Sequence, residues 1–225
     1  MESNSIALDG PVGAGKSTLA RMLAKHFGLI YVDTGALYRC IALFAQRKNI
    51  EANDSENITK LLPLINIEMK YGEDGIQRML LCGEDVTDEI RSPEISMGAS
   101  AVSAIPAVRT FLLSTQREMA KKYSVIMDGR DIGTVVLPNA GIKIFLTAKP
   151  ESRAKRRFVE LMSKNIDITY DEVLRDLLLR DKNDSERETA PLKAAEDAII
   201  LDTTNYELEK SFKVLCTIIN GRLGS

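Results

Sequence analysis

The sequence of 225 residues predicts an α/β fold in which helices flank a parallel sheet of five strands. Three observations indicate this fold. Short apolar runs alternate with segments of helical periodicity, a glycine-rich loop follows the first run, and antiparallel alternation is confined to one central stretch. Strands of a parallel sheet are buried on both faces and therefore form continuous apolar runs. The five runs are residues 6–8, 29–32, 125–127, 142–146 and 198–201.

The stretch after the first run fits the phosphate-loop pattern G-x-x-x-x-G-K-[ST] at every fixed position. Its glycines permit a tight turn that brings backbone N–H groups close to phosphate oxygens, and the following helix adds the positive end of its dipole. Lys16 is then placed to reach the β- and γ-phosphates, and Ser17 to bind the accompanying Mg²⁺. We therefore predict a nucleoside triphosphate site made of Gly10, Pro11, Val12, Gly13, Ala14, Gly15, Lys16, Ser17 and Thr18.

The segment that follows the loop has the pattern of a helix over residues 16–27, with Leu19 and Leu23 on its apolar face and Gly28 at its end. The second strand ends in Asp33 and Thr34, and residues 36–46 are predicted to form another helix. Because ligands bind at the carboxyl ends of parallel strands, these polar side chains are expected at the same sheet edge as the phosphate loop.

The pattern changes over residues 63–105. Residues 67–71 alternate, residues 72–75 are predicted to turn, a second strand follows over residues 76–82, and a helix starts near Pro93. A small antiparallel unit does not belong in a parallel series. We therefore predict that residues 63–105 are an insertion into a single core that extends over residues 1–225.

The remaining elements complete the predicted core. Helices are expected over residues 106–121, from about Pro150, from a capping box at Thr169 and Glu172 to about Arg180, and over residues 207–220.

Phosphoryl transfer requires a metal and positive charge around the migrating group, so acidic strand ends and arginines are the candidates. Asp128 follows three apolar strand residues and has the form of an acid that holds the metal; Asp33 ends the second strand in the same way and could take that role, with Asp128 preferred. Arginines lie near predicted strand ends or helix termini at Arg39, Arg109, Arg130, Arg180 and Arg187, and Arg153, Arg156 and Arg157 share one side of a helix.

The composition is that of an ordinary globular chain, with 44% hydrophobic residues, 28% charged residues and a formal net charge of -2. This charge does not predict a nucleic-acid or membrane partner. The three cysteines lie far apart in apolar contexts, which favours a cytoplasmic location. The one histidine, His26, lies on the first predicted helix without metal-ligand spacing, so we expect no histidine-based acid/base chemistry.

Longer stretches resemble the signature sequences of bacterial cytidylate kinases, and the resemblance runs from the phosphate loop to the last strand. The stretches are DTGALYR at residues 33–39, GEDVT at 83–87, VSAIPAVR at 102–109, DGRDIGTVV at 128–136, and Arg180-Asp181 followed by Asp184, Arg187 and residues 190–192. The resemblance implies a phosphate-loop nucleoside monophosphate kinase fold in which residues 63–105 are a monophosphate-binding insertion and residues 152–168 are a lid. It also implies a monomer.

The resemblance further implies roles for individual residues. Ser100, Arg109 and Asp131 would contact cytosine, Arg39 and Arg130 the monophosphate, Arg180 and Asp184 the ribose hydroxyls, with Asp33 and Thr34 also in the substrate site. Arg187 would lie near the transferring phosphoryl group or the acceptor phosphate. The implied catalytic residues are Lys16, Arg130, Arg153, Arg157 and Arg187, and the implied metal ligands are Ser17 and Asp128.

The expected reaction is in-line transfer of the γ-phosphoryl group of ATP, with Mg²⁺, to CMP or dCMP. The acceptor phosphate is largely ionised at neutral pH because its second pKa is about 6, so no general base is needed. Cytosine offers an amino donor at N4 and acceptors at N3 and O2, which an aspartate and an arginine or serine can read.

Other readings stay open. A kinase of the same architecture could act on UMP, AMP, dTMP or a small hydroxyl metabolite, although the many arginines favour an acceptor that already carries a phosphate. A phosphate-loop GTPase switch is disfavoured because the chain has no Asn-Lys-x-Asp or Thr-Lys-x-Asp signature. A nucleic-acid patch at residues 153–157 is disfavoured because aromatic residues are not interleaved with the arginines.

Overall fold

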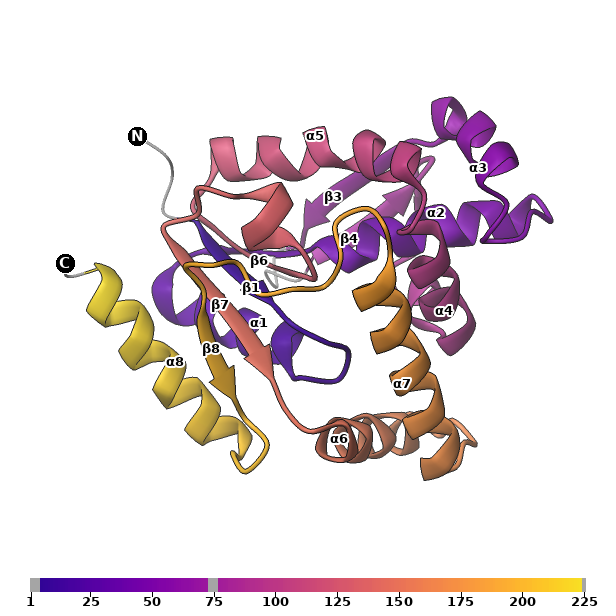
Figure 1. Cartoon of the computed structure of the whole chain (residues 1–225). Coiled ribbons are helices and arrows are strands. Elements are labelled where there is room, and N and C mark those ends of the chain that lie inside the picture. The colour runs from indigo at the N-terminus through magenta and orange to yellow at the C-terminus, as the bar shows by residue number, and fades with distance from the viewer. Residues whose placement is uncertain (1–4, 73–76, 224–225) are drawn as a thin grey trace. The chain divides into compact units, whose positions relative to one another are not determined.

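The computed structural model describes residues 5–72 and 77–223 of the chain (Figure 1). It divides into two compact units. The first unit combines Met1–Tyr31 with Ala120–Ser225, and the second is Val32–Met119. The phosphate loop and Asp128 belong to the first unit.

The main sheet has the five parallel strands that the apolar runs predicted. Its strand order is β2-β6-β1-β7-β8. The strands are β1 (Ile6–Asp9), β2 (Ile30–Asp33), β6 (Val125–Gly129), β7 (Ile142–Thr147) and β8 (Ile199–Asp202). The central strand β1 pairs in parallel with β6 and β7, so that Asp9 lies opposite Gly129 on one side and Phe145 on the other. The end of β1, where the phosphate loop begins, is therefore in the middle of the sheet.

One face of this sheet is covered by the helices α1 (Lys16–Phe27) and α8 (Leu208–Leu223). Their buried residues form one core with β1, β6 and β7, to which α1 contributes Leu19 and Leu23 and α8 contributes Leu215 and Ile219. The sequence prediction of α1 from residue 16 to residue 27 is confirmed, including its end at Gly28, which adopts the left-handed conformation with φ of 66°.

Two helices, α6 (Pro150–Ser163) and α7 (Tyr170–Glu186), form a pair with a small core of their own (Figure 1). The capping box at Thr169 and Glu172 is confirmed, since each side chain bonds the other residue's backbone N–H. The predicted end near Arg180 was too early. No glycine or proline interrupts the chain before Pro191, and the helix continues to Glu186.

The second unit contains the small antiparallel sheet that the alternating pattern predicted. Its three strands, β3 (Ile67–Tyr71), β4 (Gln77–Leu81) and β5 (Glu84–Asp85), pair in that order. The predicted turn at residues 72–75 and the first residue of the predicted strand at 76–82 fall mostly outside the described residues. Cys82 and Gly83, both at positive φ, form the turn between β4 and β5.

The helices of the second unit bury a core of mostly aliphatic side chains. They are α2 (Thr34–Arg47), α3 (Ser55–Leu61), α4 (Pro93–Val102) and the first part of α5 (Pro106–Lys122). Short 3-10 turns lie at Leu62–Leu64 and Glu89–Arg91. Helix α3 was not predicted, because it is short and buries only Ile58 completely. The predicted insertion at 63–105 lies within this unit.

Within the described residues, no single helix has the length and apolar character needed to cross a membrane, although the bent pair α4 and α5 meets the length and composition criteria when taken together.

Candidate active site

The phosphate loop connects the end of β1 to the first residue of α1. Gly10 adopts φ of 147°, and a Cβ there would lie 2.0 Å from the carbonyl oxygen of Leu146 on β7. Only glycine lets the chain pass this close to the neighbouring strand. Gly15 precedes the helix with φ of 88° and supplies no side-chain cap. The first N–H groups of α1 are therefore not capped by that residue, which suits an anion.

Lys16 is the cation of this loop. Its side chain is buried, and Nζ donates a hydrogen bond to the carbonyl oxygen of Pro11 at 2.8 Å. Burial and the nearby Arg130 lower the pKa of Lys16 to about 7, against the opposing effect of Asp128, Asp9 and Asp184. A phosphate group at the loop would favour the charged form of this lysine.

The carboxylate of Asp128, at the end of β6, lies beside the phosphate loop. Ser17 donates its hydroxyl to Asp128 Oδ2 at 2.6 Å, and Tyr31 donates to Oδ1 at 3.1 Å. Hydroxyl and carboxylate oxygens are ligands that Mg²⁺ prefers, and Mg²⁺ usually takes only one or two protein ligands along with phosphate oxygens and water. The described residues contain no group of three or more histidine, cysteine or acidic side chains that could hold a metal. The serine and aspartate pair fits a magnesium ion shared with phosphates.

The segment after Asp128 is fixed by a residue of β1. Asp131 precedes a single π-helical turn at Ile132–Val136, and its carbonyl oxygen accepts hydrogen bonds from Val135 and Val136. The buried carboxylate of Asp9 accepts from the N–H of Ile132 at 2.8 Å and of Gly133 at 2.7 Å. Burial raises the pKa of Asp9 to about 6, although these two hydrogen bonds oppose the shift.

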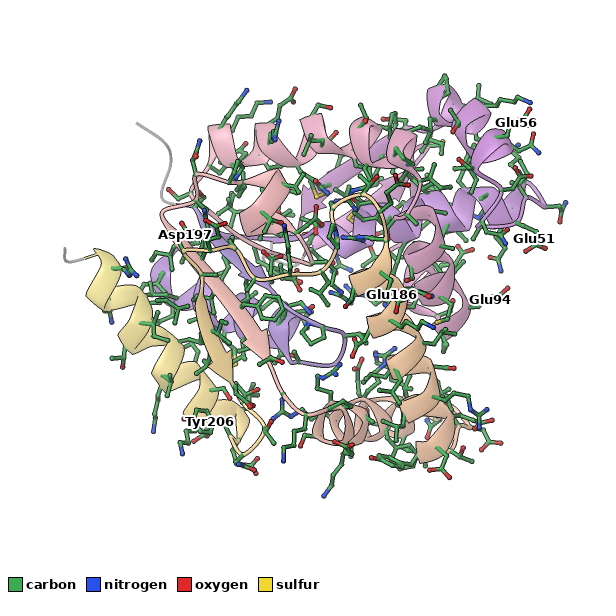
Figure 2. The ribbon with its side chains drawn as sticks, viewed as in Figure 1. Glu51, Glu56, Glu94, Glu186, Asp197 and Tyr206 are labelled. Carbon is green, nitrogen blue, oxygen red and sulfur yellow. The ribbon has the colours of Figure 1, made fainter. Side chains whose placement is uncertain are left out.

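Two ion pairs connect this segment to the end of α7 and the chain just after it. Arg130 Nε donates to Asp184 Oδ2 at 2.7 Å, and Arg187 donates to Asp131 Oδ1 at 3.3 Å. Burial by itself would lower the pKa of Arg130, but Asp184 raises it, and Arg130 in turn lowers the pKa of Asp184 against the effect of burial. Figure 2 labels Glu186, the last residue of α7, which directly precedes Arg187. Both arginines are therefore charged and held in place by carboxylates.

The arginines of α6 have different surroundings. Arg153 is buried and donates to the carbonyl oxygens of Ala148 and Val12, each at 2.8 Å, and it pairs with Asp181 at 2.6 Å. Arg157 pairs with Glu160 at 2.7 Å and is partly exposed. In this structure Arg153 supports the phosphate loop through Val12. Its predicted catalytic role and that of Arg157 stay predictions.

Arg156, the third arginine on this side of α6, holds the chain that follows β8. It donates to the carbonyl oxygen of Thr203 at 2.5 Å and to that of Tyr206, labelled in Figure 2, at 3.3 Å. These contacts give it no direct relation to the phosphate loop.

In the second unit, Asp33 and Arg39 form a pair at the start of α2. Asp33 Oδ1 accepts the N–H of Ala36 as a helix cap, and Oδ2 accepts from Arg39 Nη2 at 2.7 Å. Burial would raise the pKa of Asp33, but Arg39 and Arg91 hold it below its ordinary value. The backbone N–H of Asp33 donates to Gln77 of β4 at 3.0 Å. Asp33 thus holds a helix cap and an arginine, whereas both oxygens of Asp128 accept hydroxyl hydrogens; the assignment of the metal to Asp128 stays a prediction.

Three further predicted residues of the second unit lie on helices α2, α4 and α5. Arg109 is buried, donates to the carbonyl oxygen of Ser103 at 3.2 Å and lies over the ring of Tyr38 at 5.7 Å. Thr34 is buried, and Ser100 is half-buried on α4. The Arg109 guanidinium is therefore held by a backbone carbonyl and by the face of an aromatic ring.

The predicted residues divide between the two units. The first unit holds Lys16, Ser17, Asp128, Arg130, Asp131, Arg153, Arg157, Arg180, Asp184 and Arg187, and the second holds Asp33, Thr34, Arg39, Ser100 and Arg109. Three partners were missed from the sequence: Asp9, Tyr31 and Asp181. Asp9 could have been found, because it ends an apolar strand just as Asp33 and Asp128 do. Asp181 stands in one of the stretches that carry the family resemblance but was given no role, and Tyr31 carries no local signal.

The sequence and the fold of this chain are similar to those of known proteins. Residues 6–220 match the cytidylate kinase family. A cytidylate kinase from Caldicellulosiruptor bescii is 51% identical over 93% of this chain and 92% of its own length. One from Clostridium tetani is 45% identical over 97% of this chain and 94% of its own. A solved structure of an uncharacterized protein from Eubacterium ventriosum has a similar fold, with a TM-score of 0.52, 13% identity and coverage of 98% and 99% of the two chains.

Proposed function

The chain belongs to the cytidylate kinase family, and from this premise we propose that it transfers the γ-phosphoryl group of ATP to CMP and dCMP. The observation that carries the proposal is the phosphate loop with Lys16 at its end and Ser17 bonded to Asp128 at 2.6 Å. These are the parts that phosphoryl transfer requires on the donor side.

On the donor side, the glycine-rich loop and the start of α1 would bind the triphosphate through backbone N–H groups, and Lys16 would exchange its bond to Pro11 for phosphate oxygens. Ser17 and Asp128 would hold Mg²⁺, which supplies positive charge to the transferring group when bound. Arg130, Arg153, Arg157 and Arg187 are proposed to neutralise the charge that develops during transfer.

On the acceptor side, Arg39 and Arg130 are proposed to bind the monophosphate, supported by their carboxylate partners Asp33 and Asp184. Asp184 and Arg180 would bind the ribose hydroxyls. The acceptor phosphate needs no base, because its second pKa of about 6 leaves it ionised at neutral pH. Residues 63–105 would serve as the monophosphate-binding insertion and residues 152–168 as a lid that excludes water.

For the base, Ser100, Arg109 and Asp131 are proposed to read cytosine. Asp131 would accept the N4 amino hydrogen and the other two would donate to N3 and O2. Uracil reverses the donor and acceptor pattern at N3 and at the exocyclic position, so it would leave polar groups without partners.

The test is a coupled assay of ADP release with Mg-ATP and, separately, CMP, dCMP, UMP, AMP, GMP and dTMP. Fast turnover with CMP and dCMP alone supports the proposal. Turnover with UMP, AMP or dTMP instead would keep the kinase mechanism and refute the base contacts. We further propose that the protein acts in the cytoplasm and that it is a monomer. Sedimentation of the purified chain would test the monomeric state.

Substitution of a proposed base contact refines this test. Arg109→Ala is expected to raise the KM for CMP about tenfold or more, the loss of one charged hydrogen bond, with little change in the KM for ATP. Equal changes in both KM values would argue against the assignment of Arg109 to the base.

A further inference from the structure

Among the residues that the structure describes, Asp9 is a buried carboxylate to which the proposed mechanism assigns no role. Asp9 is the last residue of β1, is 4% exposed, and directly precedes the phosphate loop. Both of its oxygens are used, since Oδ1 accepts from Ile132 N and Oδ2 from Gly133 N. A buried carboxylate that is costly to desolvate is kept only where its hydrogen bonds compensate for that cost. These two hydrogen bonds fix the backbone at Ile132 and Gly133, the start of the turn that follows Asp131.

The two bonds cap a turn that its own first residue does not cap. Asp131 is the residue that precedes the π-helical turn, with φ of -145° and ψ of 26°, and its side chain makes no capping hydrogen bond. An aspartate in this position ordinarily turns its carboxylate back onto the N–H groups that follow. Here Asp9 occupies those N–H groups from a neighbouring strand. The carboxylate of Asp131 is thereby directed away from its own backbone and receives Arg187 instead.

The fit around Asp9 is tight. A Cβ at Gly133 would lie 3.4 Å from Asp9 Oδ2 and 3.2 Å from Cδ of Lys143. The charged groups that act on Asp9 are Asp131, which disfavours its ionised form, and Lys16, which favours it. A side chain at position 133 would thus lie against both the Asp9 carboxylate and the alkyl chain of Lys143.

We propose that Asp9 is a positioning residue for base recognition: by capping the turn after Asp131 it keeps the Asp131 carboxylate turned away from its own backbone, in the orientation in which it pairs with Arg187 and is proposed to read cytosine. The inference rests on the proposed function, because the contact between Asp131 and the base is part of it. Asp9 itself touches no substrate in this scheme. The residue that starts the phosphate loop therefore also sets the geometry of a residue that reads the acceptor.

The principal variant is Asp9→Asn, which keeps the size of the side chain. Asparagine has one acceptor oxygen and one NH₂ donor, so one of the two backbone N–H groups would face another donor and half of the cap would be lost. The KM for CMP is expected to rise about fivefold to tenfold, the effect of one lost hydrogen bond, while the KM for ATP changes by less than about twofold. Discrimination between CMP and UMP is expected to fall with it.

The matched control is Asp54→Asn. Asp54 also caps a helix, accepting the N–H of Asn57 at 3.0 Å, but it lies on an exposed part of the second unit. Its substitution is expected to leave both KM values unchanged. If Asp9→Asn does not fold, Gly133→Val is the second variant, because its branched side chain would extend from a Cβ that already lies 3.4 Å from Asp9 Oδ2; it is expected to have the same selective effect on CMP.

A double-mutant cycle with Asp131→Ala decides how Asp9 acts. If Asp9 works through Asp131, Asp9→Asn will have almost no further effect on the KM for CMP once Asp131 is alanine. Independent effects of the two substitutions, or an equal rise in the KM for ATP, would overturn the inference.

A readout without turnover separates this inference from the proposed function. The side-chain carboxyl carbon resonance of Asp131 in the ligand-free protein is expected to shift in Asp9→Asn and not in Asp54→Asn. An unchanged resonance would overturn the positioning role. A shifted resonance in a protein that does not phosphorylate CMP would support that role and refute the proposed function.

Discussion

Asp128 and Asp33 each end a strand of the main sheet after a run of apolar residues, yet their surroundings differ. Asp128, in the first unit, accepts hydroxyl hydrogens from Ser17 and Tyr31. Asp33, in the second unit, caps α2 and pairs with Arg39. A helix starts directly after Asp33, so its N–H groups reach the Asp33 carboxylate, whereas Asp128 is followed by Gly129, the last residue of β6, and no helix cap competes for its oxygens. The partners of Asp33 come from the helix that directly follows it, whereas those of Asp128 come from distant parts of the chain.

The strongest test of this comparison is Asp128→Ala. We expect kcat to fall about 100-fold to 1000-fold, the effect of removing one group that stabilises transferring charge, and the Mg²⁺ concentration for half-maximal activity to rise. Steady-state kinetics over a range of Mg²⁺ concentrations measures both. A variant with normal Mg²⁺ dependence would move the metal role away from Asp128.

Asp33→Ala is expected to change the KM for CMP and the stability, and to leave the Mg²⁺ dependence of the reaction unchanged. It removes the partner of Arg39 and the cap of α2, so the KM for CMP should rise about tenfold and the free energy of unfolding should fall by about 1 kcal/mol. Urea denaturation and the same kinetic assay check these values. A changed Mg²⁺ dependence with an unchanged KM for CMP would reverse the roles assigned to the two aspartates.

The uptake of protons should differ between binding of ATP at the phosphate loop and binding of CMP at the arginines. The pKa of Lys16 is lowered to about 7, so Lys16 is mostly neutral at pH 8 and is charged once phosphates are near. Binding of ATP at pH 8 should therefore take up about one proton. Binding of CMP should take up none, because guanidinium groups are already charged. Calorimetry in buffers of different ionisation enthalpy measures this uptake, and Lys16→Met should abolish it.

The smallest expected effect is that of Tyr31→Phe, which removes one of the two hydroxyl donors to Asp128. Loss of a single neutral donor should reduce kcat about twofold to fivefold without a change in the KM for CMP. A fall as large as that of Asp128→Ala would mean that Tyr31 and not Ser17 determines the position of the carboxylate.

Local patterns were sufficient to predict the fold. The five apolar runs, the phosphate loop, the small antiparallel sheet and the Thr169 capping box depend on neighbouring residues, and each is found in the structure. The partners within the site depend on contacts between distant segments. The bond from Asp9 to Gly133 spans 124 positions and the bond from Tyr31 to Asp128 spans 97, so no local pattern could reveal them.

Arg153 carries a mechanical consequence. Its guanidinium contacts the phosphate loop at Val12, the end of β7 through Ala148 and helix α7 through Asp181, while its own backbone belongs to α6. A rotation of the two helices must therefore pull on the loop carbonyl or break these bonds. Through this one side chain, the conformation of the phosphate loop at Val12 is coupled to the positions of α6 and α7.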